Sequence, residues 1–274
     1  MLVGYGLGWG IRGSAWGTVL AQLVEGAGFA LVVASTARRA GAELTARGGG
    51  VRQGAVVGGP LVVRTASLVT VTVAATALAA RIGDRDVAAH QIAYQVLLFL
   101  AFALDALAIA GQAMIGRLLG AADAAQARAA ARRMLEWGVL AGIGFAVVVL
   151  SARLEIAAVF TSVAGVRRLV AELLVFVALL QPLNAIVFVL DGVLIGAGDQ
   201  RYLAAAMLAA TLGVFAPAAV AVAASGAGIL VLWSALVAWF AARGFGVGLR
   251  YLGSGWQVTG PRRARGLTSS RTAA

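Results

Sequence analysis

The chain has 274 residues, of which 61% are hydrophobic and only 12% are charged, and its mean hydropathy is +0.94. A soluble domain of this length would carry roughly a quarter charged residues to cover its surface, so the composition indicates a membrane protein. All 22 basic residues are arginine, and the chain contains no cysteine and one histidine. These counts exclude a retinal Schiff base, disulfides and thiolate chemistry. We expect no metal, no cofactor and no catalytic residue.

Seven stretches of the chain are long and apolar enough to cross a membrane. They cover residues 16–37, 55–80, 87–116, 133–152, 169–196, 203–224 and 227–249. Crossing the hydrocarbon core takes about 20 apolar residues as a helix. Lipid offers no partner to an unpaired backbone group, so a spanning segment is either a helix or part of a closed barrel. Barrel strands alternate over about 10 residues, and these runs do not. The predicted fold class is therefore all-α integral membrane, with about seven transmembrane helices.

The arginines lie mainly in the short segments between these spans, and their distribution predicts the orientation of the chain. One side carries 15: Arg38, Arg39, Arg47, Arg52, Arg117, Arg128, Arg132, Arg133, Arg201, Arg243, Arg250, Arg262, Arg263, Arg265 and Arg271. The other side carries 6: Arg12, Arg81, Arg85, Arg153, Arg167 and Arg168. Cytoplasmic loops are enriched in basic residues, so we expect an outside N-terminus and a cytoplasmic C-terminus. The same distribution accounts for the net charge of +11 without a nucleic-acid partner.

The third span carries a narrow polar stripe. Tyr94, Asp105 and Gln112 are separated by 11 and 7 residues, which places them within about 20° of one another on a helix, and His90 lies on the same flank. A charge inside a membrane is costly and usually faces the bundle interior or a water-filled cavity. We interpret this stripe as a cavity wall, with Asp105 as a candidate proton or cation site. The alternative is a helix–helix contact made by small and polar residues.

The fifth span combines a proline, an amide and a carboxylate. Asn184 and Asp191 are seven residues apart and share one face of the helix. Pro182 removes a backbone donor and can bend the helix, so this region is a candidate substrate or ion site. Arg64, in the second span, is a candidate counter-ion to Asp105 or Asp191. The alternatives are an ordinary hydrogen-bonded kink for the fifth span and a snorkelling side chain for Arg64.

Several motifs resemble those of the multidrug and toxic compound extrusion (MATE) transporters, and look most like their DNA-damage-inducible protein F (DinF) branch. The matching pieces are Ala88-Ala89-His90-Gln91-Ile92-Ala93, Asp105-Ala106-Leu107-Ala108-Ile109-Ala110-Gly111-Gln112, Gly116-Arg117-Leu118-Leu119-Gly120, Arg64-Thr65, and the run from Asp191 to Asp199. Their order and spacing fit together, and the resemblance covers nearly the whole chain up to the tail.

The resemblance implies a transporter of twelve spans in two six-helix lobes. It divides this chain into four parts: 1–40, the end of the N-terminal lobe with one helix; 41–54, a cytoplasmic linker; 55–250, the six-helix C-terminal lobe; and 251–274, a basic, disordered cytoplasmic tail. On this interpretation the sequence is a piece of a longer transporter, and we expect it not to transport on its own.

The resemblance also implies the activity, which is multidrug efflux across the cell membrane and not an enzymatic reaction. Family members export small cationic or amphipathic compounds by antiport with protons or sodium, so the implied partners are the lipid bilayer, such a substrate and a coupling ion. Some members bind cations with carboxylates on the seventh and tenth spans. By the resemblance, this chain's second span corresponds to the family's seventh, and it offers Arg64 but no carboxylate. Its fifth span corresponds to the family's tenth and offers Asn184 and Asp191. This pattern favours protons over sodium as the coupling ion.

Two other functions stay open. A lipid-linked oligosaccharide flippase of the same superfamily would favour a strongly cationic central cavity, whereas the sequence indicates one intramembrane arginine among several acids. An intramembrane hydrolase would need Ser with His, or two aspartates, meeting at membrane depth. His90 has no obvious Ser partner, and the pair Asp105 and Asp191 lacks the sequence context of a protease.

Overall fold

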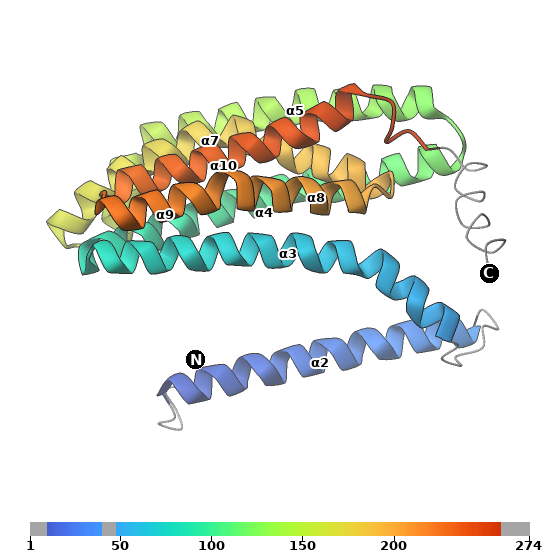
Figure 1. Ribbon diagram of the computed structural model, residues 1–274, viewed down its shortest axis with the longest axis horizontal. Helices are drawn as coiled ribbons and strands as arrows, with labels where there is room; N and C mark the ends of the chain where they lie inside the picture. The colour runs from blue at the N-terminus through green and yellow to red at the C-terminus, as the bar shows by residue number, and fades with distance from the viewer. Residues whose placement is uncertain (1–9, 40–47, 259–274) are drawn as a thin grey trace. The chain divides into compact units, whose positions relative to one another are not determined.

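The computed structural model describes residues 10–39 and 48–258 of the chain, and this part is built from helices (Figure 1). The helices are α2 (Gly10–Arg39), α3 (Gly48–Ile82), α4 (Asp84–Gly120), α5 (Ala124–Ser151), α6 (Arg153–Phe160), α7 (Ala164–Gly196), α8 (Gln200–Ala210), η1 (Thr211–Phe215), α9 (Ala216–Ser225) and α10 (Ile229–Leu252). They fall into two units, residues 1–55 and 56–274. The first contains α2 and the start of α3.

Within the described residues, seven helical spans are long and apolar enough to cross a membrane, which confirms the predicted all-α membrane fold. They are Ala15–Arg39, Gly58–Ile82, Asp84–Gly120, Ala124–Ser151, Ala164–Gly196, Gln200–Ser225 and Ile229–Leu252. Some predicted spans are shorter than the observed helices, because polar residues continue the helices beyond the apolar run. α5 begins nine residues before the predicted start, at an Ala- and Arg-rich segment with high helix propensity. The Asp123 side chain caps this helix by accepting from the Gln126 amide at 2.9 Å.

The helix α7 is the centre of the second unit. It packs against α4, α5, α6 and α10, and 18 of its 33 residues are buried. Glycines allow these close approaches, as small residues do between membrane helices. Gly192 lies directly against the Ala108 carbonyl of α4, and Gly142 of α5 lies against the α7 backbone at Gln181. The Gly244 position of α10 contacts the Leu183 side chain in the same way.

The sixth span is interrupted at its middle, which the sequence analysis did not predict. Five residues, Thr211–Phe215, form a π-helical turn in which the Ala216 amide donates to the Thr211 carbonyl. Pro217, two residues after the end of this turn, has no backbone N–H, and such a proline disturbs the regular hydrogen-bond ladder of a helix. The buried Thr211 hydroxyl accepts a hydrogen bond from Trp239 Nε1 of α10 at 3.2 Å, so the irregular turn is anchored to its neighbour.

The apolar interior of the second unit forms two clusters, and polar residues lie between them along α7. The first cluster includes α7 residues up to Leu180, together with Trp233 and Trp239 of α10. The second includes α7 residues from Val189 onward, together with Trp256. Gln181 and Asn184 occupy the interval and are both buried. The break in the core therefore coincides with the predicted polar segment of the fifth span.

Replacing Gly192 with alanine should destabilise the second unit, because the new methyl group would overlap the Ala108 carbonyl of α4. Overpacking of this kind costs about 1–3 kcal/mol. Thermal unfolding of the purified protein in detergent measures the effect as a lower midpoint. Gly144→Ala on α5 is the matched control, since a methyl group there would meet nothing within 4 Å. Equal midpoints for the two variants would contradict the close packing of α4 on α7.

Candidate functional site

A buried carboxylate joins three helices. Asp191 of α7 is 3% exposed. Its Oδ2 accepts a hydrogen bond from Arg64 Nη2 of α3 at 2.7 Å and another from Arg243 Nη2 of α10. A charge at membrane depth is costly unless it is paired, so each of these groups depends on the others. The three charges leave the cluster with one net positive charge. Arg64 is thus a counter-ion of Asp191, which is one of the two pairings, with Asp105 or with Asp191, that the sequence suggested.

Arg243 lies in a buried position that differs from the location predicted for it from the sequence. It was counted among the arginines on the cytoplasmic side, but it lies inside α10, nine residues before the helix ends, and is 3% exposed. The sequence contains the signal that would have found it. Leu232, Leu236, Trp239, Arg243 and Val247 recur at helical spacing, and all are buried. Removing Arg243 from the count leaves 14 arginines against 6, so the predicted orientation is unchanged.

Several polar atoms on the same side of α7 have no hydrogen-bond partner among the described residues. They are Asp191 Oδ1, both amide atoms of Asn184, and Gln181 Oε1. Asn184 and Asp191 are separated by two helical turns, about 10 Å along the axis. Most buried polar groups in proteins are hydrogen-bonded, so this face of α7 has unusual capacity to bind a polar ligand. In the described part of the chain, no three acidic or histidine side chains come together as a metal site requires.

The predicted stripe on α4 divides between two ends of the helix. Near its start, the Tyr94 hydroxyl lies 3.0 Å from the Thr72 hydroxyl of α3. His90 is buried, stacks on Tyr94 with 5.9 Å between ring centroids, and lies 3.4 Å from the Thr76 hydroxyl. Near the other end the Gln112 residue is exposed, and its backbone instead packs against α7. Tyr94 and Gln112 are therefore not parts of one hydrogen-bonded group.

Asp105 is half-buried and makes no hydrogen bond or ion pair with another described residue. Its depth follows from the packing of α4 on α7, where Ala108 meets Gly192 and Gln112 meets Gly196. The two helices therefore run parallel, and Asp105 is level with residue 189, about 3 Å in depth from Asp191. Asp105 also shares a flank with Tyr94, which contacts α3. The two carboxylates therefore lie at similar depth in the lobe, and they are not bonded to each other.

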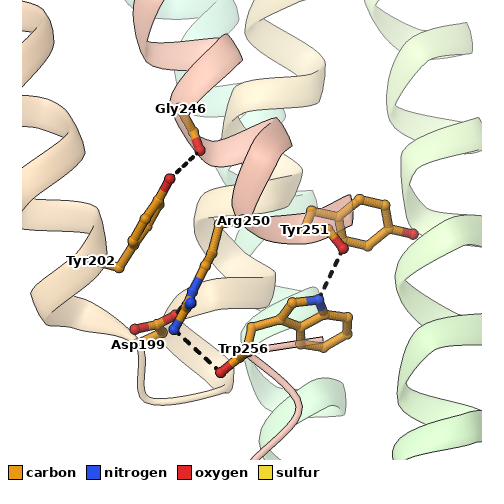
Figure 2. Close-up of polar contacts among 7 residues, drawn as sticks. Asp199, Tyr202, Gly246, Arg250, Tyr251 and Trp256 are labelled. Atoms are coloured by element: carbon orange, nitrogen blue, oxygen red, sulfur yellow. Dashed lines mark hydrogen bonds and ion pairs between the residues drawn. The ribbon is translucent and has the colours of Figure 1, made fainter. Parts of the chain in front are cut away.

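A second polar cluster ties the end of α10 to the loop after α7. Arg250 Nε donates to Asp199 Oδ2 at 2.5 Å, and its Nη2 donates to the Gly255 carbonyl at 3.2 Å. The Tyr202 hydroxyl donates to the Gly246 carbonyl at 2.7 Å, as Figure 2 shows. Of this cluster, the sequence analysis had singled out only Asp199, as the end of a family-like motif. These contacts fix α10 to α7 and α8.

The apolar helical spans and this buried ion-paired centre are those of a multi-pass helical membrane protein. The family model MatE matches residues 60–221, and the chain belongs to the MatE family. It is 36% identical over 211 residues to Protein DETOXIFICATION 43 of Arabidopsis thaliana. It is 31% identical over 140 residues to the DNA damage-inducible protein F of Escherichia coli strain K12. These matches confirm the resemblance to MATE transporters and to DinF.

The chain spans well under half the length of these relatives. The matched region covers 77% of this chain but 39% of the Arabidopsis protein, and 51% of this chain but 30% of the Escherichia coli protein. Among solved structures, a MOP superfamily transporter from Pyrococcus furiosus matches with a TM-score of 0.63 and 18% identity. That match covers 69% of this chain and 42% of the other, so it shows a common fold over one part of a larger transporter.

Asp191→Asn should destabilise the protein more than either arginine substitution at this cluster. Without the carboxylate, Arg64 and Arg243 remain together in the interior with no opposite charge, and breaking a buried pair in this way costs about 3–5 kcal/mol. Arg64→Gln leaves Arg243 paired with Asp191 and should cost less. Unfolding free energies in detergent measure both effects. Asp105→Asn is the control, since Asp105 has no partner among the described residues, and a loss equal to that of Asp191→Asn would contradict the assignment.

Proposed function

We propose that this chain forms the C-terminal lobe of a proton-coupled antiporter that exports small organic compounds across the cell membrane. Membership of the MatE family supports the transporter class. The observation that carries the coupling mechanism is the pairing of Asp191 with arginines from two other helices. A buried carboxylate that holds two cations is a group whose protonation would alter contacts between helices, which is what a coupled transporter requires.

The proposed switch acts on α3. The ionised carboxylate of Asp191 holds Arg64, whereas a protonated carboxyl would bind a guanidinium more weakly. The half of α3 around Arg64 is poorly covered, with Leu61, Val62 and Val63 all exposed. The other half contributes Val71, Ala75 and Ala79 to the apolar core. Proton uptake by Asp191 would therefore release the Arg64 half of α3 while the other half stays packed.

The contacts of α10 support the proposal that this helix is a fixed support. Gly244 packs against α7, the Tyr202 hydroxyl binds Gly246, and Arg250 binds Asp199. Loss of the pair between Arg243 and Asp191 would leave those contacts in place. Alternating access moves one part of a transporter against another around a central site. In this proposal α3 moves, α7 and α10 stay together, and Asp105 and Asn184 line the cavity that α3 covers.

We place the C-terminus in the cytoplasm on the strength of the 14 to 6 arginine distribution. The chain has no native cysteine, so single cysteines can report the sides of the membrane. Cysteine at position 162, from Ser162→Cys, should react with an impermeant maleimide added to intact cells. Cysteine at position 269, from Ser269→Cys, should react only after the cells are opened. Labelling in the reverse order would refute this orientation.

Transport tests the proposal directly. Two proteins are reconstituted in liposomes: the chain alone, and the chain fused behind the first five spans of the Escherichia coli relative. Both preparations receive a pH gradient and a fluorescent cationic dye. We expect gradient-dependent dye movement for the fusion and none for the chain alone, because one lobe lacks its opposing wall. Asp191→Asn in the fusion should abolish the dependence on the gradient. Undiminished proton-coupled transport by that variant would remove Asp191 from the mechanism.

A second candidate function is movement of an anionic cargo, such as the lipid-linked oligosaccharide considered above. The buried Arg243 favours it, since two arginines against one carboxylate give the Asp191 cluster one net positive charge. The Pyrococcus furiosus transporter is itself described as having a binding pocket of reverse polarity that suggests a different function. The same liposomes loaded with an anionic dye separate the two candidates. Preferential movement of the anion, lost on Arg243→Gln, would favour the second.

A further inference from the structure

A groove of about 880 Å³ lies at the end of the lobe where α5 begins and α10 ends. Its lining combines residues from the first half of α5, the last turn of α10 and the segment that follows α10: Ala124, Ala125, Arg128, Ala129, Arg132, Arg133, Glu136, Tyr251, Leu252 and Gln257. Figure 2 shows Tyr251 directed from α10 toward the neighbouring pale green helix, α5. Three arginines and one glutamate give the groove two net positive charges.

The three arginines differ in how strongly they are already engaged. Arg128 donates to the last carbonyls of α10, at 3.0 Å to Tyr251 and Gly253 and 3.3 Å to Leu252. Arg132 pairs with Glu136 at 3.1 Å, but both side chains are well exposed, and such surface pairs contribute little. Arg133 is exposed and makes no ion pair with another described residue. Arg132 and Arg133 are thus available to bind an anion.

The same face of α5 becomes aliphatic immediately beyond the groove. Leu140, Ile143 and Val147 follow Glu136 at intervals of four, three and four residues, which is one helical face. They are 61%, 47% and 60% exposed. One face of α5 therefore presents guanidinium groups near the start of the helix, followed by about two turns of exposed aliphatic side chains. A ligand that matches both parts has an anionic head and a long apolar chain.

We propose that this groove binds an anionic phospholipid, with its phosphate at Arg132 and Arg133 and an acyl chain along Leu140, Ile143 and Val147. A soluble phosphate would leave the aliphatic stripe unused, and a zwitterionic lipid would leave the positive charge uncompensated. The proposed orientation places the groove at the cytoplasmic leaflet, where anionic lipids attract basic residues near the surface. The site is independent of the transport mechanism, because none of its residues belongs to the Asp191 cluster.

A second groove provides a matched control. It has a volume of about 560 Å³, lies at the start of α7, and contains Arg153, Arg167, Arg168 and Glu172, so its charge is the same. The turns of α7 that follow are packed into the lobe, and in them only Leu179 is exposed. Leu154 of α6 also lines this groove and is exposed, but no continuous aliphatic stripe follows the arginines along α7. The proposal therefore predicts weaker lipid retention there despite equal charge.

Native mass spectrometry of the whole chain in detergent tests the proposal, with phosphatidylglycerol or phosphatidylcholine added in increasing amounts. We expect one phosphatidylglycerol to bind more tightly than the rest, and phosphatidylcholine to show no such step. The double variant Arg132→Gln, Arg133→Gln should weaken that step roughly 30-fold, given the contribution of each basic residue near an anionic surface. The double variant Arg167→Gln, Arg168→Gln should leave it unchanged. Both variants must retain the wild-type unfolding midpoint for the comparison.

Three outcomes would overturn the proposal. Equal weakening by the two double variants would show unspecific attraction between lipid and any arginine pair. Equal binding of phosphatidylcholine would show that the negative charge is not recognised. The third outcome is that glycerol phosphate and short-chain phosphatidylglycerol displace the bound lipid at the same millimolar concentration. That result would show that the apolar stripe contributes nothing to binding, and the site would then be one for soluble phosphate.

Discussion

The pairing of Asp191 with two arginines is the constraint on which the arrangement of α3, α7 and α10 depends. A single ionised side chain inside a membrane protein is costly, and removing one partner leaves an uncompensated buried charge. Asp191 and Arg243 are almost fully buried, so neither can reach solvent by itself. Arg64 is partly exposed and approaches from a helix that is otherwise lightly packed at that depth. The three helices therefore have a preferred arrangement that a change of protonation at Asp191 would weaken.

The glycines of the lobe make this pairing geometrically possible. Gly192 lets α4 approach one side of α7, and Gly244 lets α10 approach another. Since α7 is enclosed by α4, α5 and α10, its remaining face is the one that carries Asn184 and Asp191. Small residues thus define which face of α7 carries the buried polar groups, and large apolar residues fill the two clusters on either side of it.

The sequence predicted the helical membrane fold, the number of spans and the family, because apolar run length and motif spacing are local properties. It offered Arg64 as a counter-ion of either Asp105 or Asp191, with a snorkelling side chain as the alternative, and the structure pairs Arg64 with Asp191. It missed Arg243, because counting arginines by side of the membrane assigned this residue to the basic C-terminal region. It also missed the π-helical turn at Thr211–Phe215 and the short helix α6. The joint cavity of Asp105, Asp191, Asn184, Tyr94, Gln112 and Arg64 stays a prediction.

The second arginine changes how the charge of the site is understood. From the sequence, several acids faced one intramembrane arginine, which favoured a cationic substrate. In the structure the only acid bonded within this cluster is Asp191, and Asp105 stands apart with no bonded partner among the described residues. The two carboxylates can therefore serve different tasks. Asp191 would control the helix contacts through its protonation, while Asp105, at similar depth and free of arginine, is the carboxylate left to meet a cation. Under the proposed function, a cationic cargo would depend on Asp105, and an anionic cargo would depend on Arg64 and Arg243.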